Sequence, residues 1–457
     1  MNLLVKDKCF YKKMAVIAIP ISLQSMITIG VNMTDTVMVG KLGETSLSAT
    51  ALANQFVNIY QICCMGIAMG ASVLTSRFWG MQDITSLKKT ITMMLRLCIV
   101  LAVLFMLPTI LIPQLLMRMY TNDSAVIAQG VQYFKWMVYC YFLQGMTMTC
   151  TIVLRSVGQV NFPLFTSIGS FFVNILFNYM FIFGKLGVPR MEVEGAGVGT
   201  LIARVFEFSL ICGYFLFVDR KIGYRLKDLR MKCNSLIKDY VSISIPVFVS
   251  DSLLALGTSA VAMVMGRIGT GFVSANSITV VTQQLTTVII QGICHASCIM
   301  TGHTLGQGER EKAQQQAWTF LILGLVVGIL GGGLIKVLSR PIIGLYNITP
   351  ETAQIAGELM DAIAFIVIFQ SMNSILTKGV LRGGGDTKFL MVADIIFLWA
   401  ASLPLGILAG LVWHLDAFWI YVFLKIDQIC KSIWCVFRLR SGKWIKTFSK
   451  EKMNHAQ

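Results

Sequence analysis

The sequence predicts an all-α, polytopic membrane protein with twelve transmembrane helices in two six-helix bundles. Hydrophobic residues make up 56% of the 457 residues and charged residues only 13%, and the mean hydropathy is +0.72, which is too apolar for a soluble protein. Long apolar runs recur between short polar breaks, and roughly 20 such residues cross a bilayer as one helix. Short motifs of the first half also recur in the second half, which predicts a duplicated architecture.

Each long apolar run is expected to form one transmembrane helix, because a helix satisfies its own backbone hydrogen bonds in lipid. Lys6, Lys8, Lys12 and Lys13 precede the first run, which lacks a small-residue cleavage site. This run is therefore expected to stay in the mature protein as the first span. In chain order, the expected helices cover residues 14–39, 48–77, 90–113, 124–154, 161–183, 196–218, 238–265, 273–303, 314–338, 353–380, 389–412 and 415–437.

Lys and Arg lie mainly in every second break between the expected helices and in the two tails. Residues 219–238 form the richest of these breaks, whereas the alternate breaks carry few basic residues, such as Lys41 and Arg118. Basic residues concentrate on the cytoplasmic side of membrane proteins. The pattern predicts a multi-pass protein of the cell inner membrane with both termini in the cytoplasm. The formal net charge of +16 then reflects membrane orientation, and no nucleic-acid partner is expected.

The two halves of the chain align at one constant offset over most of their length. Pro20 aligns with Pro246 and Gly40 with Gly266. Each half is expected to hold an even number of helices, so the repeats have the same orientation and are related by a pseudo-two-fold axis along the membrane normal. The expected domains are an N-terminal lobe over residues 1–218, a cytoplasmic linker over 219–237, a C-terminal lobe over 238–437 and a basic cytoplasmic tail over 438–457.

Asp35 lies inside the first apolar run, close to Gly40 and Gly43, where that run ends. An ionised carboxylate inside a bilayer is costly and usually functional. The alternative is that Asp35 reaches the interface at its helix end or pairs with a neighbouring helix. The matching run of the second half ends in Met265-Gly266-Arg267-Ile268-Gly269 and has no acid at this position. Ion chemistry is therefore expected chiefly in the first half.

Further motifs accompany Asp35. They are Val39-Gly40-x-x-Gly43, Leu154-Arg155-x-x-Gly158, Asn174 and Asn178, Gly195-Ala196-Gly197-Val198-Gly199-Thr200, and Leu381-Arg382-Gly383-Gly384-Gly385-Asp386-Thr387. Together these motifs resemble the multidrug and toxic compound extrusion (MATE) family, and the resemblance covers nearly the whole chain. It implies a secondary active antiporter, not an enzyme, that needs no cofactor and exports cationic or amphipathic small molecules by alternating access in exchange for H+ or Na+.

The resemblance also implies which residues bind the coupling ion. In the family the first-span Asp works with polar groups of the fifth and sixth spans, which here match Asn174, Asn178 and Thr200. With Asp35 these side chains offer oxygen ligands that suit Na+ as the metal, or a carboxylate that exchanges a proton. Some relatives carry a second Asp at the position of Asn178, so the choice between H+ and Na+ stays open. The two asparagines could also simply join helices by hydrogen bonds.

The second half carries Asp251 in its first span, and we expect it to contact substrate. Along the repeat frame Asp251 lies about 15 Å closer to the cytoplasm than Asp35, near the middle of the membrane. Other relatives have a Glu in this span and an Asp in the tenth span, where this chain has Ser371 and Asn373. Pro20 and Pro246 are hinge candidates, because a proline inside a helix removes a backbone hydrogen bond, although a static bend is the alternative.

Two other functions are alternatives to export. A flippase for lipid-linked saccharide precursors would need several basic residues in its cavity, and only Arg96 and Arg204 lie within the expected spans. A membrane-embedded enzyme would need convergent acids or histidines, and only His295 and His303 lie within spans. Both functions are therefore less favoured than export.

Beyond small-molecule substrates, membrane lipid is the expected partner, and a monomer is expected. The basic tail with Trp444 is expected to lie on anionic lipid.

Arg155 and Arg382, at equivalent inner helix ends, are expected to anchor the interface or to bind helix ends. Asp361 and Asp394 are further acids within the expected spans. The 26 Met and 28 Phe residues could line an adaptable drug pocket.

Overall fold

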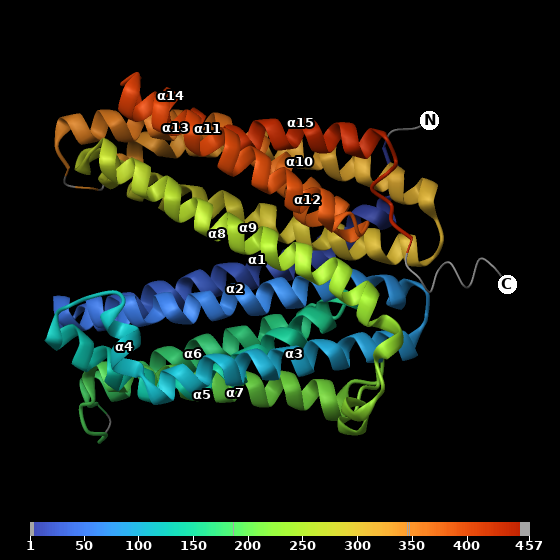
Figure 1. Cartoon of the computed structure of the whole chain (residues 1–457), viewed down its shortest axis with the longest axis horizontal. Coiled ribbons are helices and arrows are strands. Elements are labelled where there is room, and N and C mark those ends of the chain that lie inside the picture. The colour runs from blue at the N-terminus through green and yellow to red at the C-terminus, as the bar shows by residue number, and fades with distance from the viewer. Residues whose placement is uncertain (1–3, 186, 345, 347, 448–457) are drawn as a thin grey trace. The chain divides into compact units, whose positions relative to one another are not determined.

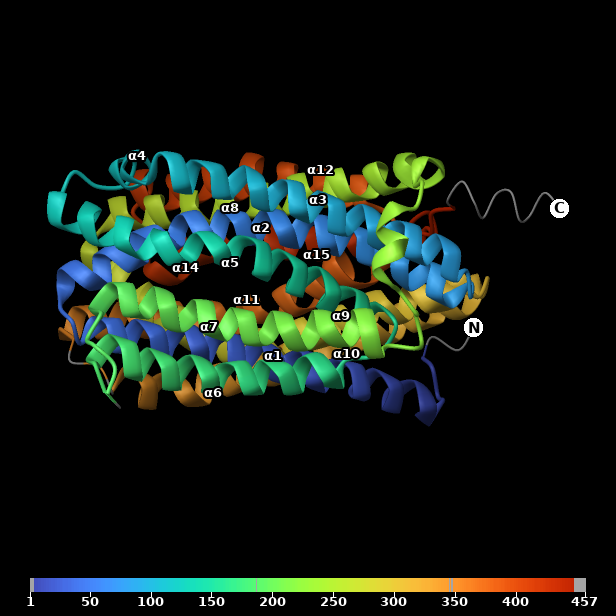
Figure 2. The same cartoon turned by 90° about the horizontal axis from the view of Figure 1, so that it is seen from below.

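The computed structural model describes residues 4–185, 187–344, 346 and 348–447, and these residues form helices and connecting loops without any strand. The predicted all-α fold is confirmed (Figures 1 and 2). Eleven helices of the described chain are long and apolar enough to cross a membrane. The chain is therefore a multi-pass membrane protein.

The helices follow the predicted order closely. Residues 161–183 form α6 with the expected bounds, whereas α3 begins before residue 90 because Asp83 caps its N-terminus by accepting a hydrogen bond from the backbone N–H of Ser86. The first half contains α1 (Lys8–Gly40), α2 (Glu44–Gly80), α3 (Ile84–Leu111), α4 (Pro113–Arg118), α5 (Ser124–Ser156), α6 (Asn161–Phe183), α7 (Glu192–Gly213) and a π-helical continuation of α7, η1 (Tyr214–Val218).

The linker holds two short 3-10 helices, η2 (Leu226–Arg230) and η3 (Asn234–Leu236). The second half contains α8 (Ile237–Ile268), α9 (Thr270–Gly306), α10 (Arg310–Ile343), α11 (Pro350–Ser374), η4 (Ile375–Leu381), α12 (Thr387–Asp394), η5 (Ile395–Ser402), α13 (Leu403–Ile407), η6 (Leu408–Val412), α14 (Ala417–Leu424) and α15 (Ile426–Arg440).

The helix expected at 415–437 is divided. Lys425 separates α14 from α15, because its backbone leaves the helical conformation (φ −120°, ψ 14°). Three π-helical segments were also not predicted from the sequence. They are η4, which continues α11, η5, which continues α12, and η6, which continues α13. These turns change which side chains share a helix face, so face assignments made with a regular α-helical period fail beyond them.

The helices group into two compact units. The first-half unit comprises Leu23–Thr75 and Gln82–Tyr240, and the second-half unit comprises the described residues up to Ser22, Ser76–Met81 and those from Val241 onward. This grouping follows spatial contacts, whereas the expected lobes, 1–218 and 238–437, follow the order of the chain. The lobes stay a prediction about which parts move together.

Within the second-half unit, the end of α2 packs against the end of α9 through small residues. A Cβ atom at Gly80 would meet the carbonyl oxygen of His303, and a Cβ atom at Gly306 would meet the carbonyl oxygen of Arg77. These four residues form two pairs of repeat equivalents, at the offset that relates Pro20 to Pro246. The contact is therefore reciprocal, as a pseudo-two-fold relation between the repeats requires, and glycine allows the two backbones to approach closely.

The start of the C-terminal tail packs inside the second-half unit. Trp444 is fully buried, lies over Gly384 and donates a hydrogen bond from its Nε1 to Gln314 Oε1 at 2.7 Å. Asp386 forms ion pairs with Arg438 at 2.6 Å and with Lys446 at 3.2 Å. The expectation that Trp444 anchors the tail on lipid is wrong, because the glycines after Arg382 leave room for its indole ring.

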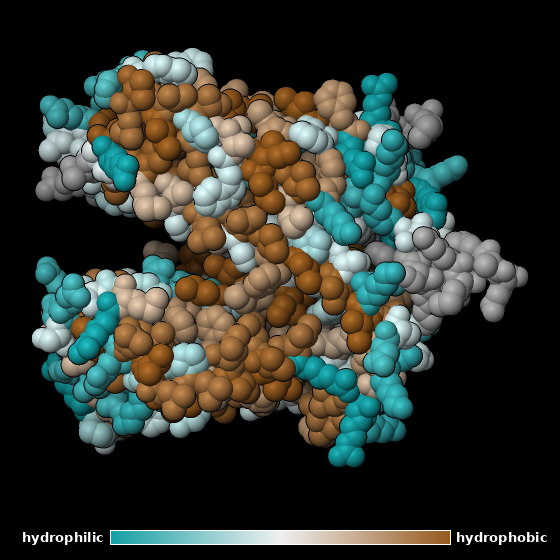
Figure 3. Space-filling model, viewed as in Figure 1, coloured by the Kyte–Doolittle hydropathy of each residue, from teal (hydrophilic) through white to brown (hydrophobic). Residues whose placement is uncertain are grey.

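Large apolar side chains are exposed on the outer faces of the helices. Examples are Val100 and Leu104 on α3 and Leu330 and Val337 on α10, each 62% to 72% exposed. Figure 3 shows such side chains over the middle of the helices and hydrophilic ones toward the helix ends. Exposed apolar side chains over the middle of long helices are typical of the lipid-facing surface of a multi-pass membrane protein.

Candidate functional site

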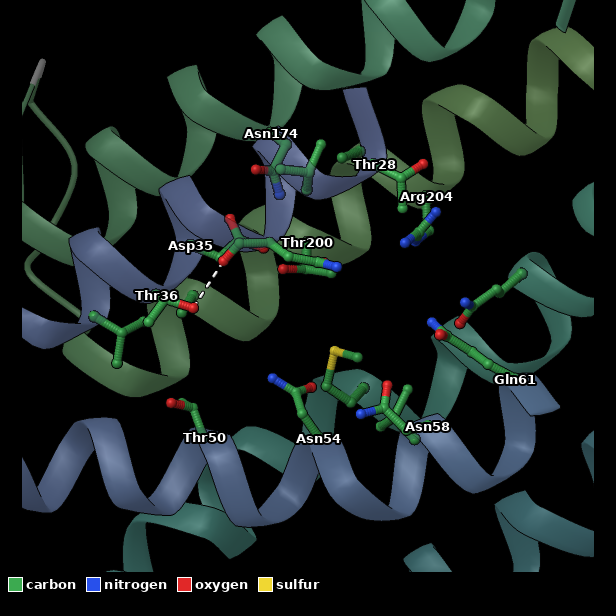
Figure 4. A pocket seen from close by; sticks show the side chains of 18 of the residues that line it. Thr28, Asp35, Thr36, Thr50, Asn54, Asn58, Gln61, Asn174, Thr200 and Arg204 are labelled. Carbon is green, nitrogen blue, oxygen red and sulfur yellow. Dashed lines mark hydrogen bonds between the residues drawn. The ribbon is translucent and has the colours of Figure 1, made fainter. Parts of the chain in front are cut away.

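Five helices of the first-half unit, α1, α2, α5, α6 and α7, line a cavity of about 360 Å3. Hydroxyl, amide and charged side chains dominate its wall, and the lining residues include one methionine, Met137, and no phenylalanine. Figure 4 shows Asp35, Asn174 and Thr200 close together, with the polar side chains of α2 on the opposite wall. Polar groups inside a membrane protein are costly unless they face such a cavity.

Asp35 and the two predicted asparagines meet at one edge of this cavity. Asn178 Nδ2 donates a hydrogen bond to Asp35 Oδ1 at 2.6 Å and a longer one to Asn174 Oδ1 at 3.3 Å. Both asparagines are buried, being 2% and 0% exposed. Their shared face follows from their spacing of one helical turn on α6. No basic side chain in the described part of the chain lies within ion-pair distance of Asp35.

A glycine of α7 makes room for Asn178. A Cβ atom at Gly199 would collide with the side-chain oxygen of Asn178 and would lie 2.9 Å from its backbone nitrogen. Asn178 Oδ1 itself is buried and has no hydrogen-bond partner among the described residues. An unpaired buried amide oxygen beside a carboxylate is available to a cation or to a hydrogen-bond donor.

Thr200 lines the same cavity next to Asp35 in Figure 4, although no hydrogen bond joins the two among the described contacts. The hydroxyl of Thr200, the oxygens of Asp35 and the amide oxygens of Asn174 and Asn178 form a set of hard ligands, which suits a small monovalent cation. In the present arrangement the amide nitrogen of Asn178, not its oxygen, faces the carboxylate. A cation at Asp35 would therefore have to displace this hydrogen bond.

The same face of α7 carries two charged residues that we did not assign to the site from sequence. Arg204 and Glu207 both line the cavity, and Arg204 Nη1 donates to Glu207 Oε2 at 2.8 Å. Their spacing from Thr200, four residues and then three, places all three side chains on one helix face. This spacing was visible in the sequence as a signal for a functional face.

The cavity wall on α2 was also not predicted. Thr50, Asn54, Asn58 and Gln61 line it from this helix, and Tyr133 of α5 donates a hydrogen bond to Asn54 Oδ1 at 3.2 Å. These four polar residues recur every three or four positions along α2. Such a polar stripe marks a helix face that lines a polar cavity, and it could have been found from the sequence.

In the second-half unit, Asp251 is held by a basic residue. Arg382 Nη2 donates to Asp251 Oδ1 at 2.9 Å, and the two side chains are 5% and 17% exposed. The repeat equivalent of Arg382 is Arg155, whose Nη2 donates to the amide oxygen Oε1 of Gln24 at 2.5 Å. Each arginine therefore ties its helix to the first helix of its own repeat, and the second half uses a carboxylate where the first uses an amide.

Asp394 belongs to a second buried ionic group. Lys431 Nζ lies 3.0 Å from Asp394 Oδ1 and 3.0 Å from Asp427 Oδ2, and Ser250 Oγ donates a hydrogen bond to Asp394 Oδ2. All three charged side chains are at most 8% exposed. Asp361, in contrast, is 44% exposed and pairs with Lys336 at 2.5 Å. Asp251, Asp394 and Asp361 therefore each have a basic partner.

The hinge candidates lie inside continuous helices. Pro20 is within α1 and Pro246 is within α8. Both helices extend for more than a turn on either side of the proline. Hinge motion at these positions stays a prediction.

The comparisons with known proteins agree with this architecture. The family model described as MatE matches residues 20–180 and 246–429. The chain is 24% identical to a probable multidrug resistance protein NorM of Thermotoga maritima, over 95% of this chain and 93% of that protein. It is also 24% identical to the uncharacterized transporter YisQ of Bacillus subtilis, over 90% of each.

Solved structures show the same fold. The MATE transporter VcmN of Vibrio cholerae in its bent form superposes with a TM-score of 0.85 at 16% sequence identity, covering 96% of this chain and 99% of that one. A MOP superfamily transporter from Pyrococcus furiosus superposes with a TM-score of 0.83 at 19% identity, covering 95% and 97%. Because the family model matches most of the chain in both halves, the chain belongs to the MATE family and is a membrane transporter, not an enzyme.

Proposed function

We propose that the protein is a secondary active multidrug efflux antiporter, which exports cationic or amphipathic compounds in exchange for H+ or Na+. The observation that carries this proposal is Asp35, a carboxylate at a polar membrane cavity whose hydrogen-bond partner is the amide of Asn178. A carboxylate without a fixed basic partner can take up a proton or a monovalent cation and release it again. The relatives named as multidrug resistance proteins support the substrate class.

The proposed cycle couples this site to export by alternating access. An inward-moving cation binds Asp35 from the outside and displaces the hydrogen bond from Asn178. That binding favours the conformation with low affinity for the exported compound, so the compound leaves to the outside. Release of the cation inside returns the high-affinity state. Asp35, Asn174, Asn178 and Thr200 are the proposed ion-coupling residues.

Both coupling ions are compatible with the residues at the site. A proton would need only the carboxylate of Asp35. Sodium would need several oxygen ligands, and the amide of Asn178 would have to turn so that its unpaired Oδ1, rather than its Nδ2, faces the ion. We therefore keep H+ and Na+ as alternatives for experiment.

The distribution of basic residues also supports a location and an orientation in the membrane. The basic residues of the linker and both tails favour a location in the inner membrane with both termini in the cytoplasm. We propose a monomer with no cofactor. Asp251 stays a candidate substrate contact, although a cationic substrate would have to compete with Arg382 for it.

The cavity gives little support to the alternative function, a flippase for lipid-linked saccharide precursors. Its wall holds Arg204, but Glu207 already pairs with that arginine. A pyrophosphate group carries several negative charges and is bound by several basic side chains. One arginine that is already paired does not supply them.

The test is transport by the purified protein in proteoliposomes loaded with a fluorescent cation such as ethidium. A pH gradient and a Na+ gradient are imposed separately, and efflux is followed against liposomes without protein. We expect one of the gradients to drive export and the other to have little effect. If neither gradient drives export of any cationic dye, the antiport proposal is wrong.

A further inference from the structure

Arg204 and Glu207 form an ion pair on the wall of the same cavity as Asp35. The distance between Arg204 Nη1 and Glu207 Oε2 is 2.8 Å, and the side chains are 31% and 13% exposed. Figure 4 shows Arg204 at the cavity, across from Asn58 and Gln61. The pair lies one to two helical turns beyond Thr200 on α7, so it is part of the cavity and separate from the contact between Asp35 and Asn178.

The pair uses only part of its hydrogen-bonding capacity. The guanidinium of Arg204 has five N–H donors, and its bond to Glu207 is the one hydrogen bond that the described residues offer it. The remaining donors of Arg204 therefore have no acceptor among the described residues. Arg204 lines the cavity and its side chain is 31% exposed, so a ligand in the cavity can reach this residue.

The rest of the wall favours a polar ligand. Amide side chains at Asn54, Asn58, Gln61 and Gln144 line the cavity, and they can donate and accept hydrogen bonds. Among the described residues of this wall, Tyr133 and Met137 are the only aromatic and methionine side chains, which are the kinds that bind lipophilic cations. The cavity therefore complements a ligand with several polar groups better than a purely lipophilic cation.

The charges of Arg204 and Glu207 narrow the class of ligand further. A ligand anion that displaced Glu207 from Arg204 would leave Glu207 without its partner, and a ligand cation that displaced Arg204 from Glu207 would leave Arg204 without its partner. An unpaired charge in a membrane cavity is strongly unfavourable. A ligand with both charges can replace both halves of the pair and leave no charge unpaired.

We propose that Arg204 and Glu207 are a recognition pair for zwitterions, that is, for small compounds that carry a carboxylate and an ammonium group close together. The ligand carboxylate binds the guanidinium of Arg204 through two parallel hydrogen bonds, and the ligand ammonium binds the carboxylate of Glu207. The exchange leaves the net charge of the cavity unchanged, so it does not compete with cation uptake at Asp35. This inference rests on the proposed export function and names the substrate class of that cavity.

The test uses three dyes that share one dansyl group and one five-carbon chain. Nε-dansyl-lysine carries both charges, dansylcadaverine lacks the carboxylate, and 6-(dansylamino)hexanoic acid lacks the ammonium. Binding to the purified full-length protein is measured by fluorescence anisotropy. We expect the zwitterion to bind at least about tenfold more tightly than either singly charged dye, because each of these leaves one charge unpaired.

The informative variant is Arg204→Gln combined with Glu207→Gln, which removes the pair without changing the net charge. It should bind the three dyes with similar affinity. The matched control is Lys135→Gln with Glu194→Gln, which removes an ion pair of the same unit that does not line the cavity, and it should keep the preference. Should the double glutamine variant fail to fold, the charge reversal Arg204→Glu with Glu207→Arg keeps a pair and should keep the preference.

Equal binding of the three dyes by the unmodified protein would overturn the inference, as would an undiminished preference in the double glutamine variant. The proposed function is tested separately by transport. If a gradient drives export of dansylcadaverine but the zwitterion is not preferred in the binding assay, only the recognition pair is wrong. If the zwitterion is preferred but no gradient drives its export, the antiport proposal is wrong.

Discussion

Asp35 in the first-half unit and Asp251 and Asp394 in the second-half unit are all carboxylates within membrane helices, yet their partners differ in kind. Asp35 accepts a hydrogen bond from an amide, whereas Asp251 pairs with Arg382 and Asp394 pairs with Lys431. A carboxylate paired with an arginine or lysine already has its counter-charge inside the protein. An incoming cation would have to displace that side chain, which would be left buried and unpaired.

An acid within a membrane span is therefore not sufficient evidence of ion coupling. Two equivalent arginines support this conclusion. Arg155 and Arg382 occupy equivalent positions in the two repeats, and they bind the amide of Gln24 and the carboxylate of Asp251, respectively. In both halves the arginine joins its helix to the first helix of the repeat, but the acceptor is neutral in one half and charged in the other. Asp251 can therefore be explained by helix packing alone, whereas Asp35 has no ion-pair partner among the described residues.

The largest expected effect is that of Asp35→Asn on coupled transport. Asparagine keeps the size of the side chain but cannot carry a negative charge, so it can neither take up a proton at the carboxylate nor balance a cation. Gradient-driven efflux from proteoliposomes should fall to the background of empty liposomes, while thermal unfolding in detergent stays close to that of the unmodified protein. Efflux that still responded to the gradient would show that the carboxylate of Asp35 does not couple transport to the ion.

The next largest effect is expected for Lys431→Met, measured as thermal stability. This change leaves Asp394 and Asp427 buried without their shared ammonium group. Breaking a buried ion pair from one side costs about 3–5 kcal/mol. The control is Lys431→Arg, which keeps the charge. A Lys431→Met protein as stable as the unmodified one would show that the ionic group of the second-half unit does not stabilise the fold.

A smaller effect is expected for Asp251→Asn. Arg382 loses the charge of its partner but keeps an amide oxygen as an acceptor, so we expect a loss of about 2 kcal/mol in stability. The double variant Asp251→Asn with Arg382→Gln should recover much of this loss. The response of transport to the cation gradient should persist. If this response disappeared while stability was unchanged, Asp251 would belong to the coupling machinery.

The smallest effect is expected for Gln24→Glu, which gives Arg155 the kind of partner that Arg382 has. A charged acceptor should strengthen this contact and raise stability by about 1 kcal/mol. The hydroxyl of Ser167, which now accepts a hydrogen bond from Gln24 at 2.8 Å, can donate to the new carboxylate instead. Unfolding in detergent measures the change. A clear loss of stability would mean that the two arginine contacts are not equivalent.

Much of the fold followed from the sequence because lipid imposes simple rules. Each backbone group must be satisfied within its own span, so apolar length and charged breaks predict helices. The contacts of the candidate site could be predicted from the sequence less completely than the fold. Asn174 and Asn178 share a face because their spacing fixes it, but the partners of Asp251 and Trp444 required the packed structure.

The face that a membrane helix turns toward its neighbours is hard to predict from sequence. Lipid and protein interior are both apolar, so the hydrophobic pattern of a span does not distinguish its buried side from its lipid side. Polar stripes are the exception, and Thr50, Asn54, Asn58 and Gln61 on α2 carried such a stripe. The π-helical turns of the second half add a further shift in register that no composition predicts.

The all-α membrane fold, the duplicated motifs and the acid in the first span without an equivalent in the second half could all be predicted from the sequence. The pairing of the charges is seen only in the packed structure, because ion pairs such as Arg382 with Asp251 join helices far apart in the chain. The packed structure also shows that Arg204 and Glu207 face the cavity of Asp35. The physical reason is that hydropathy depends on local composition, whereas the pairing of charges depends on how the helices are rotated and packed.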